Sequence, residues 1–333
     1  MSHPDQASGG GRTATIMPPH GTSLAEYATA HGLTQSAARP KLRQYLAEVW
    51  SRRQFIWAFA SAKNISLYTD AKLGQVWQVL TPLLNAAVYY LIFGVLLGTS
   101  RGLPDFIPFL VAGVFLFGFT QRSIQSGAKS VGDNVSLIRA LHFPRATLPL
   151  AYAVIELQQL LLSMVVLFAI VFAFGEPITW HMLLVIPVVL MQLGFNLGIS
   201  LSMARVGAFS PDFNQLLPFL LRTWMYFSGV IFSVASLKKN HSIADHPWVG
   251  KLLEINPGYV YPELARRELL GEYRHYVHAP EHWVYKKGVR TNIGGLAEGG
   301  SAHLWIWAAI WLVVMLIGGF LFFFRAEERY GRG

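Results

Sequence analysis

Six long apolar runs constrain what this chain can fold into more than any other feature of its sequence. They cover residues 76–97, 106–121, 148–174, 182–204, 213–234 and 304–324. Each is close to the ~20 residues that a helix needs to cross the hydrocarbon core of a bilayer. Because a backbone in lipid must satisfy its own hydrogen bonds, such runs fold as helices. The sequence therefore predicts an all-α integral membrane protein with six transmembrane helices.

The composition supports the membrane class and argues against other classes. Of 333 residues, 53% are hydrophobic and 14% are charged, whereas about a quarter are charged in soluble domains. The formal net charge of +9 is explained by loops that retain Lys and Arg in the cytoplasm. No soluble domain with a basic face is visible, so nucleic acid is not an expected partner. The chain has no cysteine, which excludes disulfides, thiolate metal sites and cysteine nucleophiles.

The distribution of basic residues predicts the orientation. Lys and Arg precede the first run, lie between the second and third runs, and follow the sixth. The loop at 175–180 contains neither, and the loop at 98–105 contains only Arg101. The positive-inside rule then places both termini in the cytoplasm. The long segment 236–302 falls outside, since long loops are translocated largely regardless of charge.

Two different segments precede the first run. Residues 1–40 are rich in Gly, Ser, Thr and Ala, which predicts a disordered cytosolic tail. In residues 41–60 apolar side chains recur every three or four positions, with charged side chains on the opposite face. Trp50 and Trp57 lie near arginines in this segment, so we expect a helix in the headgroup layer. A helix in an ordinary soluble core is the alternative.

A short basic segment, 129–146, separates the second and third runs. Its apolar residues repeat at helical spacing, while its basic residues point elsewhere. Phe143-Pro144 ends the helix, because proline removes a donor and disfavours a helical conformation before it. A small basic helix at the mouth of a membrane domain suits a soluble ATPase. The residues predicted to contact it are Leu137, Ile138, Arg139, Leu141 and His142.

The long outer segment, 236–302, contains two short helical stretches interrupted by prolines. One leads up to Asn256-Pro257, and the other runs from Glu263 to Leu270. Their apolar content predicts re-entrant or interfacial helices at the outer leaflet. The remainder of the segment, which includes two Gly-Gly pairs, is expected to be a flexible loop.

No catalytic or nucleotide site is predicted in this chain. Gly127-Ala128-Lys129-Ser130 resembles the end of a phosphate-binding loop. A P-loop requires glycine where Ala128 and Ser123 stand, and it must follow a strand rather than a membrane helix. ATP and Mg²⁺ are therefore expected on a separate subunit, and this chain is expected to bind no cofactor and not to be an enzyme. The residues Ser, His and Asp form no nucleophile motif either.

A histidine cluster has the spacing of a zinc site, but we do not expect it to bind metal. It comprises His275, His278 and His282, with Glu272 and Glu281 nearby. Pro280 interrupts the helix that would present these side chains on one face. An ordinary solvated loop is predicted.

Two charged residues fall inside predicted spans. Glu156 and Arg222 lie about nine residues into the third and fifth runs, on the order of 13 Å inside the cytoplasmic boundary. A charge facing lipid is costly, so we expect these two side chains to face each other or a conduit. A purely structural ion pair is the alternative.

Aromatic residues crowd the second and fifth runs. Sugars bind aromatic faces through their C–H surfaces, so such clusters are predicted to line a path for a glycan. Packing or lipid contact is the alternative for each individual residue. The predicted lining residues are Phe115, Phe119, Trp224 and Tyr226.

Several segments together resemble a known family. The sequence is similar to ABC-2 type permeases that export polysaccharide, O-antigen, teichoic acid or cell-wall galactan. The similarity covers residues 41–333 and is strongest in Leu73–Leu84 with Tyr90 and Phe93-Gly94, Phe143–Pro149, Ser210–Phe213, Asn256-Pro257 and Ala326–Gly331.

The resemblance implies a homodimer joined to two ATP-binding cassette subunits in the bacterial cytoplasmic membrane. Such a complex moves a glycan linked to polyprenyl diphosphate to the outer leaflet. By the same resemblance, residues 41–60 form the gate helix among membrane lipids, and residues 135–142 form the coupling helix. Asn256, Pro257 and Tyr259 belong to the outer re-entrant gate. Arg52 and Arg53 are placed to attract the diphosphate at headgroup level.

Other functions remain open from the sequence. The N-terminal tail and the outer loop at about 270–302 look longer than usual in the family. The Ala-, Gly- and Arg-rich composition suggests a high-GC bacterium, which favours a galactan cargo. Alternatives are a drug or small-lipid exporter, an exporter of a free acidic polymer, a membrane-embedded glycan polymerase, and a passive channel.

Overall fold

The computed structural model describes residues 41–69, 72–98, 103, 105–140, 143–234, 247–278, 282–286, 289–293, 300–327 and 330. The predicted N-terminal tail lies outside these residues. Leu141 and His142 of the predicted coupling segment also lie outside them.

Five helices in the described part of the chain are long and apolar enough to cross a membrane. The first, Gly74–Leu96, comprises η1 (Gly74–Val76), α4 (Trp77–Tyr89) and the π-helical η2 (Tyr90–Leu96). The others are α5 (Phe106–Lys129), α7 (Thr147–Ala173), η4 (Trp180–Leu184) continued by α8 (Val185–Phe209), and α15 (Ala302–Phe324). Five of the six predicted spans are thereby confirmed as helices of suitable length and composition, which supports a multi-pass membrane protein.

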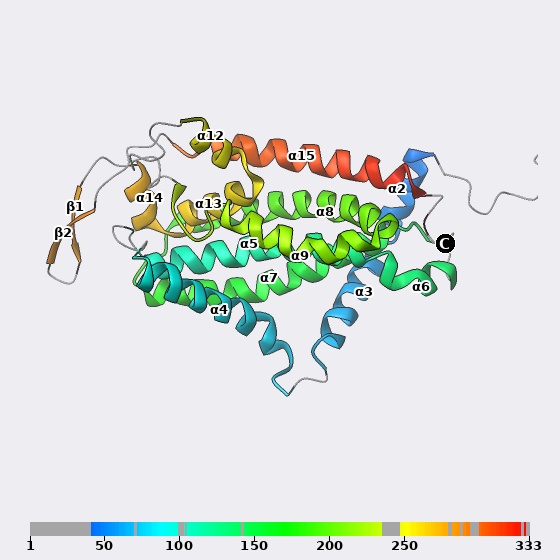
Figure 1. The fold of residues 1–333 in the computed structure, drawn as a ribbon, viewed down its shortest axis with the longest axis horizontal. Coiled ribbons are helices and arrows are strands. Elements are labelled where there is room, and N and C mark those ends of the chain that lie inside the picture. Colours follow the sequence, from blue (N-terminus) through cyan, green and yellow to red (C-terminus); the bar gives the residue numbers. More distant parts are fainter. Residues whose placement is uncertain are drawn as a thin grey trace, which may run out of the picture. The chain divides into compact units, whose positions relative to one another are not determined.

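The helices alternate in direction between two ends of a bundle (Figure 1). One end carries α6 (Val135–Ala140), and we refer to it as the α6 end. The other carries α14 (Gly271–His278), and we refer to it as the α14 end. The first described helix, α2 (Leu42–Ser51), and the C-terminal segment after α15 both lie at the α6 end (Figure 1). The two ends of the described chain therefore share one end of the bundle.

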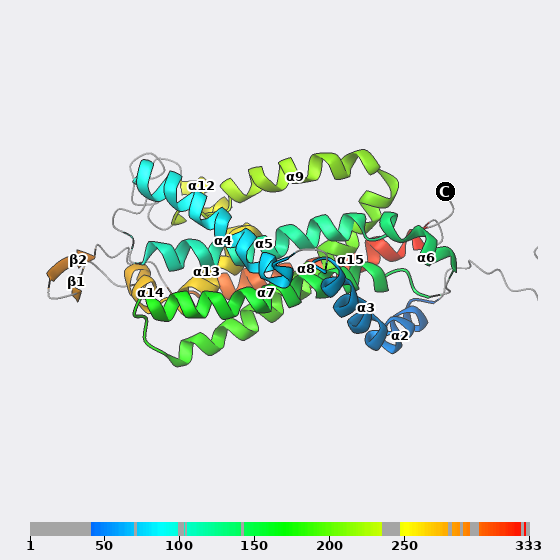
Figure 2. The same cartoon turned by 90° about the horizontal axis from the view of Figure 1, so that it is seen from below.

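The fifth predicted run forms a shorter helix than expected. It is α9 (Pro211–Tyr226), 16 residues long, and it is followed by turns that contain Gly229 with φ 59°. At 1.5 Å per residue this helix is about 24 Å long, which is less than the ~30 Å hydrocarbon core. The chain nevertheless passes from the α6 end to the α14 end here, since α8 ends and α15 begins at opposite ends (Figure 2). A sixth full membrane span is not established.

The second span is longer than predicted. The helix α5 runs to Lys129 rather than ending at residue 121. Hydropathy falls after Gln121, but the helix continues because one side of it stays buried at Ile124, Gly127 and Ala128. Most of α5 is enclosed by α4, α7, α8, α9 and α13 (Pro257–Leu269), which makes it the central helix of the bundle.

The predicted single helix at residues 41–60 is two helices. The first, α2, ends at Ser51, and α3 (Arg53–Ser66) begins after a break at Arg52, where φ is −88° and ψ is 9°. The two helices bury different faces. Tyr45 and Val49 of α2 pack against the C-terminal segment, whereas Ala60 of α3 packs against α7. The break allows each apolar face to reach its own partner.

The segment between α9 and α15 contains more structure than predicted. The two expected short helices are present as α12 (Pro247–Ile255) and α13, with the interruption at Asn256. The region expected to be a flexible loop contains α14 and an antiparallel hairpin of β1 (His282–Lys286) and β2 (Val289–Ile293), which pairs His282 with Ile293. The expectation of a loop was therefore wrong for these residues.

Glycines set the spacing between α8 and α15, the most extensive helix pair in the described chain. A Cβ atom at Gly198 would lie 2.1 Å from the carbonyl oxygen of Met315, and one at Gly319 would lie 2.0 Å from the carbonyl oxygen of Gly198. Small residues permit such close backbone approach in membrane helices. This contact fixes α15 against the bundle.

Candidate functional site

A polar stripe runs along α5 where the helix leaves the bundle core. Gln121, Arg122, Gln125 and Ser126 recur at helical spacing and are half-buried, whereas the intervening Ile124 is buried. The preceding part of α5, residues 106–120, is apolar and almost entirely buried. Polar groups at this depth require a partner or water rather than lipid. The stripe therefore suits contact with water or with polar groups rather than with lipid acyl chains.

Arg122 of this stripe forms an ion pair with Glu156 of α7. The guanidinium Nε donates to the Glu156 carboxylate at 2.9 Å, and the two side chains are 29% and 9% exposed. Arg122 lies seven residues before the end of α5, and Glu156 lies nine residues after the start of α7. At 1.5 Å per residue, both are about 10–14 Å from the helix ends. Both residues therefore lie well inside helices that are long and apolar enough to cross a membrane.

Of the two expected arrangements of Glu156 and Arg222, facing each other or facing a conduit, the structure does not show the first. Arg222 is exposed on α9, and the partner of Glu156 is Arg122. Arg122 was predicted to lie in a loop, because the apolar run that predicted the second span ends at residue 121. Of the expected alternatives for Glu156, an ion pair or exposure to water, the structure shows the ion pair, and the extended α5 provides the partner.

Side-chain amides form a second polar cluster next to the ion pair. Asn64 of α3 is its centre: its carbonyl oxygen accepts from Gln78 of α4 at 3.0 Å, and its amide donates to Gln158 of α7 at 3.2 Å. Gln159 also donates to Asn64 at 3.4 Å, and Gln158 donates to Ser61 at 3.0 Å. Gln159 and Glu156 are three residues apart on α7 and so share a face. This cluster was not predicted from the sequence, because its residues come from three helices that no short-range pattern connects.

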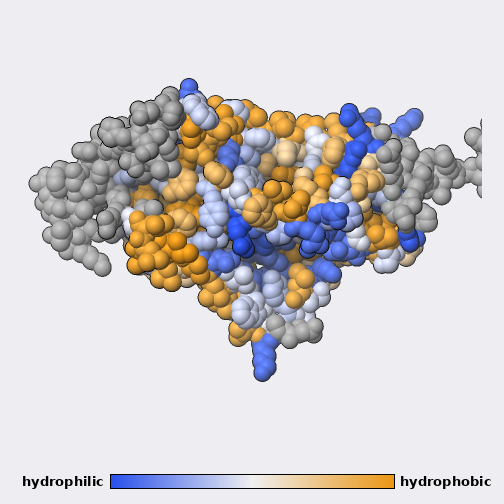
Figure 3. All heavy atoms as spheres, viewed as in Figure 1, coloured by the Kyte–Doolittle hydropathy of each residue, from blue (hydrophilic) through white to orange (hydrophobic). Residues whose placement is uncertain are grey.

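We refer to the ion pair, the α5 stripe and the amide cluster together as the polar wall, a set of hydrogen-bonding groups in which Arg122 balances the charge of Glu156. Figure 3 shows hydrophilic side chains bordering a hollow between α3, α4 and α9, beside broad apolar areas. Amides, a hydroxyl and a guanidinium can exchange hydrogen bonds with hydroxyl or phosphate oxygens.

A second surface feature is apolar. A groove of about 800 Å³ between α7 and the η4–α8 segment is lined by apolar residues, including Leu161, Phe168 and Trp180. Such a groove suits an acyl chain.

The aromatic residues predicted to line a path occupy different environments. Phe115 and Phe119 are fully buried inside the single chain, so they do not line any of its surfaces. They face the core because the buried side of α5 includes both positions. Trp224 is half-buried and donates from Nε1 to Asn256 at 2.9 Å. Tyr226 is 42% exposed, which leaves it available to a partner, lipid or cargo.

At the α6 end, the predicted coupling residues divide between two faces. Ile138 is buried, and Leu137 is half-buried beside it, in a cluster with Phe323 and Phe324. Arg139 is exposed. The apolar face of α6 thus packs partly on its own chain, and Ile138 is turned away from any partner subunit.

The predicted headgroup residues stand at the break between α2 and α3. Arg52 and Arg53 are both exposed. The guanidinium of Arg53 donates to the carbonyl oxygen of Trp50 at 3.3 Å and lies 5.7 Å from the centre of its ring. A cation held beside an exposed tryptophan is suited to the boundary between lipid and water.

At the α14 end, the predicted gate residues hold α13 against the end of α9. Asn256 caps α13 by accepting from the Gly258 N–H at 2.9 Å. Its amide also donates to Ser228 Oγ at 3.1 Å and to the carbonyl oxygen of Phe227 at 3.2 Å. Pro257 begins α13, and Tyr259 is fully buried.

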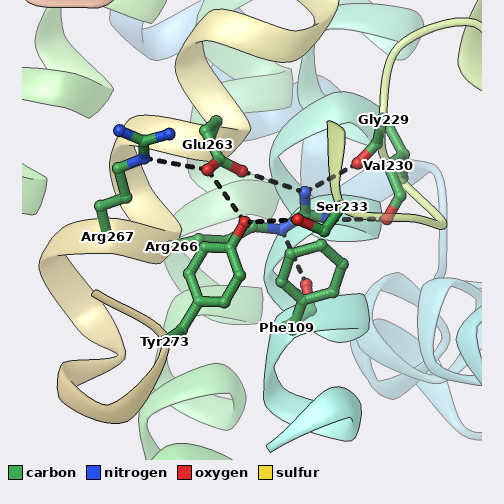
Figure 4. A network of polar contacts seen from close by, with 8 residues as sticks. All are labelled: Phe109, Gly229, Val230, Ser233, Glu263, Arg266, Arg267 and Tyr273. Carbon is green, nitrogen blue, oxygen red and sulfur yellow. Dashed lines mark hydrogen bonds and ion pairs between the residues drawn. The ribbon is translucent and has the colours of Figure 1, made fainter. Parts of the chain in front are cut away.

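After this cap, α13 carries a cluster of buried charged residues that was not predicted from the sequence (Figure 4). Arg266 donates from Nε to the carbonyl oxygen of Phe109 at 2.9 Å and from Nη1 to that of Gly229 at 2.8 Å. Its Nη2 donates to the carbonyl oxygen of Val230. Because Gly229 and Val230 lie beyond the end of α9, their carbonyl groups have no helical donor. Arg266 therefore satisfies the backbone where α9 stops inside the bundle.

Acidic and hydroxyl groups complete the charge cluster. Glu263 accepts from Arg267 Nε at 2.9 Å and from the Tyr273 hydroxyl at 3.0 Å, and it lies 3.7 Å from Arg266 Nη1. Ser233 is within 3.3 Å of the Tyr273 hydroxyl. The cluster joins α5, α13, α14 and the turn after α9, so these four elements are fixed to one another.

Comparison with known proteins supports a single family. Residues 54–266 match the family model described as ABC-2 type transporter. The chain is 26% identical over 191 residues to the O-antigen export system permease protein RfbA of Myxococcus xanthus, an alignment that covers 57% of this chain and 73% of that protein. It is 25% identical over 167 residues to the protein of the same name from Klebsiella pneumoniae, which covers 50% of this chain and 64% of that protein. The chain thus spans slightly less than two thirds of the Klebsiella relative.

Proposed function

Because the chain belongs to the ABC-2 type transporter family, we propose that it is the membrane subunit of an ATP-driven exporter of a lipid-linked polysaccharide. The cargo is a glycan on polyprenyl diphosphate, which moves from the cytoplasmic to the outer leaflet of the bacterial cytoplasmic membrane. ATP and Mg²⁺ are bound by two partner subunits at the α6 end, and two copies of this chain form the conduit. Both termini then face the cytoplasm.

The observation that carries this proposal is the polar wall. A glycan has many hydroxyl groups that cannot enter hydrocarbon without losing their hydrogen bonds. The wall offers replacement partners, of which Gln121, Gln125 and Gln158 are half-buried side chains. The charge of Arg122 is balanced by Glu156 at 2.9 Å, so the wall does not hold an anion tightly. The names of the two relatives, both O-antigen export permeases, support the same cargo class.

The proposed path begins at the break between α2 and α3. The exposed Arg52 and Arg53 attract the diphosphate at headgroup level. Closure of the ATP-binding subunits displaces α6, and the helices connected to it open the conduit. The glycan then passes along the polar wall toward the α14 end, where Asn256 and Arg266 hold the outer helices.

An exporter of drugs or small lipids is the second candidate within the family. The apolar groove of about 800 Å³ favours it, because the groove accommodates an acyl chain. Galactan, O-antigen and teichoic acid remain alternative cargoes of the first candidate.

The deciding experiment is to deplete the protein and to measure the lipid-linked glycans of the membrane by mass spectrometry. The proposal expects full-length polyprenyl-linked glycan to accumulate while the mature surface product disappears. Unchanged lipid-linked glycan would contradict it, and accumulation of another lipid would favour the second candidate. Truncated glycan would instead indicate a polymerase.

The ion pair gives a prediction that separates function from folding. Arg122→Met and Glu156→Gln each leave one polar group without its partner, which costs about 2 kcal/mol. We expect each single variant to lower export several-fold and to lower the melting temperature of the purified complex. The double variant is expected to recover the melting temperature but not export, since the wall stays altered. Arg222→Met serves as the stability control, because Arg222 is exposed. A melting temperature equally low in the double variant would contradict the pairing.

Two apolar residues of α6, Leu137 and Ile138, are expected to respond differently to the same substitution. Leu137→Asp is expected to weaken co-purification of the ATP-binding subunits, since Leu137 is half-buried at the edge of the helix. Ile138→Asp is expected to lower the thermal stability of this chain itself, because Ile138 is buried. Burying an unpaired carboxylate costs several kcal/mol. Retention of the ATP-binding subunits by Leu137→Asp would argue against α6 as the coupling contact.

A further inference from the structure

Three segments that are far apart in the sequence meet at the α6 end through one buried carboxylate. They are α2, the start of α7 and the segment after α15 (Figure 1). The residues that join them are Tyr45, Arg145, Ala146 and Glu327, and we refer to this contact as the clasp. Tyr45 and Glu327 are separated by 282 positions.

Tyr45 uses its hydroxyl group both as a donor and as an acceptor. The hydroxyl donates to Glu327 Oε2 at 2.8 Å and accepts from the backbone N–H of Ala146 at 3.1 Å. The side chain is fully buried, and its ring lies 5.0 Å from that of Phe324. Burial, together with the nearby Glu327 carboxylate, raises the pKa of Tyr45 well above its ordinary value. The hydroxyl therefore keeps its proton and remains a donor.

Glu327 binds the start of α7 with its other oxygen. Its Oε1 accepts from the backbone N–H of Arg145 at 3.0 Å, and its own carbonyl oxygen accepts from the Arg145 guanidinium. A buried carboxylate is unfavourable unless hydrogen bonds compensate for lost solvent. Here each carboxylate oxygen has a partner in a different segment, so the carboxylate links Tyr45 to Arg145.

The clasp joins segments that lead along the chain to α6 on one side and to the polar wall on the other. Arg145 and Ala146 follow α6 closely, since that helix ends at Ala140 and α7 begins at Thr147. Tyr45 lies on α2, which leads directly into α3. The far part of α3 carries Asn64, the centre of the amide cluster. A displacement of α6 is therefore connected to the wall by the chain on either side of the clasp and by the hydrogen bonds of the clasp itself.

We propose that the clasp transmits the displacement of α6 to α2 and α3, with Glu327 as a positioning residue that acts through Tyr45. The proposal rests on the proposed function, because it requires ATP-driven movement of α6. It predicts that loss of the clasp separates ATP hydrolysis from export without dismantling the complex.

The first test uses the assembled complex of this chain with its ATP-binding subunits in proteoliposomes. Glu327→Gln and Tyr45→Phe, singly and together, are compared with Tyr330→Phe. Tyr330 is a matched control, because it lies in the same terminal segment and its hydroxyl donates to the carbonyl oxygen of Phe323 at 3.1 Å rather than taking part in the hydrogen bonds of the clasp. We expect both clasp variants to retain ATPase activity while glycan exported per ATP falls about tenfold, equivalent to ~1.4 kcal/mol. The double variant is expected to fall no further, since the two residues act as one unit.

Proportional losses of ATPase activity, export and melting temperature in the clasp variants would overturn the proposal, because they indicate a purely structural contact. Equal losses in Tyr330→Phe, or additive losses in the double variant, would overturn it as well.

A second test does not depend on the cargo. The chain contains no cysteine, so Leu46→Cys on α2 and Ser136→Cys on α6 place spin labels at two exposed positions. We expect trapping of the ATP-bound state to move both labels relative to the bundle in wild type, and only the α6 label in Glu327→Gln. Movement of the α2 label in Glu327→Gln would overturn the clasp. Absence of any nucleotide effect in wild type would instead overturn the proposed function.

Discussion

Replacing Gly319 by alanine is expected to destabilise the protein strongly, whereas the same replacement at the adjacent Gly318 is expected to leave stability almost unchanged. A Cβ atom at Gly319 would lie 2.0 Å from the carbonyl oxygen of Gly198 and 2.7 Å from its carbonyl carbon. Both atoms belong to the backbone of α8, so the helices themselves must separate. At Gly318 no heavy atom lies within 4 Å of the added Cβ.

The expected cost at Gly319 is about 3 kcal/mol, at the upper end of the usual range for overpacking, since no side chain can rotate away. Gly198→Ala should have a similar effect, because its Cβ would meet the backbone of Met315 at 2.1 Å. Thermal unfolding of the purified protein in detergent measures both. Equal melting temperatures for the Gly318 and Gly319 variants would show that α15 does not pack on α8 through this contact.

Replacing Arg266 by methionine is expected to cause the second large loss of stability. Methionine keeps much of the side-chain volume but donates no hydrogen bond to Phe109, Gly229 or Val230. Removing one partner from a buried charge network typically costs about 3–5 kcal/mol. We expect a low yield of folded protein and a lowered melting temperature. Export should fall in proportion to the remaining folded protein.

Gly113→Ala tests the same contact without changing Arg266. A Cβ atom at Gly113 would lie 1.9 Å from Arg266 Nη2 and 2.9 Å from the carbonyl oxygen of Val230. It should therefore displace the guanidinium and reproduce much of the loss. Arg274→Met is the matched control, since Arg274 is a half-buried arginine on α14 outside the cluster. If Arg274→Met destabilises as much as Arg266→Met, the carbonyl contacts are not the cause.

The sequence predicted most of the bundle because membrane helices are specified by length and hydropathy. Five of six predicted runs are long apolar helices, and the interruption at Asn256-Pro257 was anticipated from its proline. The run at 213–234 forms a shorter helix than predicted, because hydropathy does not report that Gly229 turns the chain. The carbonyl groups of that turn accept hydrogen bonds from Arg266 of α13, which is a separate segment.

The candidate site was predictable only in part. Glu156 is visible in the sequence as a charge inside an apolar run, and the structure confirms that it has a partner. The partner, Arg122, was missed because the hydropathy of α5 falls before the helix ends. A signal for the α13 cluster was present, since Glu263, Arg266 and Arg267 occur at helical spacing. Their burial depends on α5 and the turn after α9, which no local pattern indicates.

The clasp was not predictable from local sequence at all. Tyr45 belongs to an amphipathic pattern that explains its burial but not its hydroxyl group. Glu327 lies in a charged terminal segment of the kind usually exposed to solvent. Their contact depends on two helices and a loop that converge only in the folded bundle.

The contact of Arg266 with the turn after α9 also bears on the order in which the chain enters the membrane. Arg266 lies 36 positions after Val230, so it is synthesised after the turn that it stabilises. Until then, the carbonyl groups of Gly229 and Val230 have no guanidinium to bind in lipid. A continuous helix through residues 213–234 would satisfy those groups until Arg266 is present. We therefore expect a nascent chain that ends before α13 to hold this segment as an uninterrupted span, which breaks into α9 and its turn when Arg266 arrives.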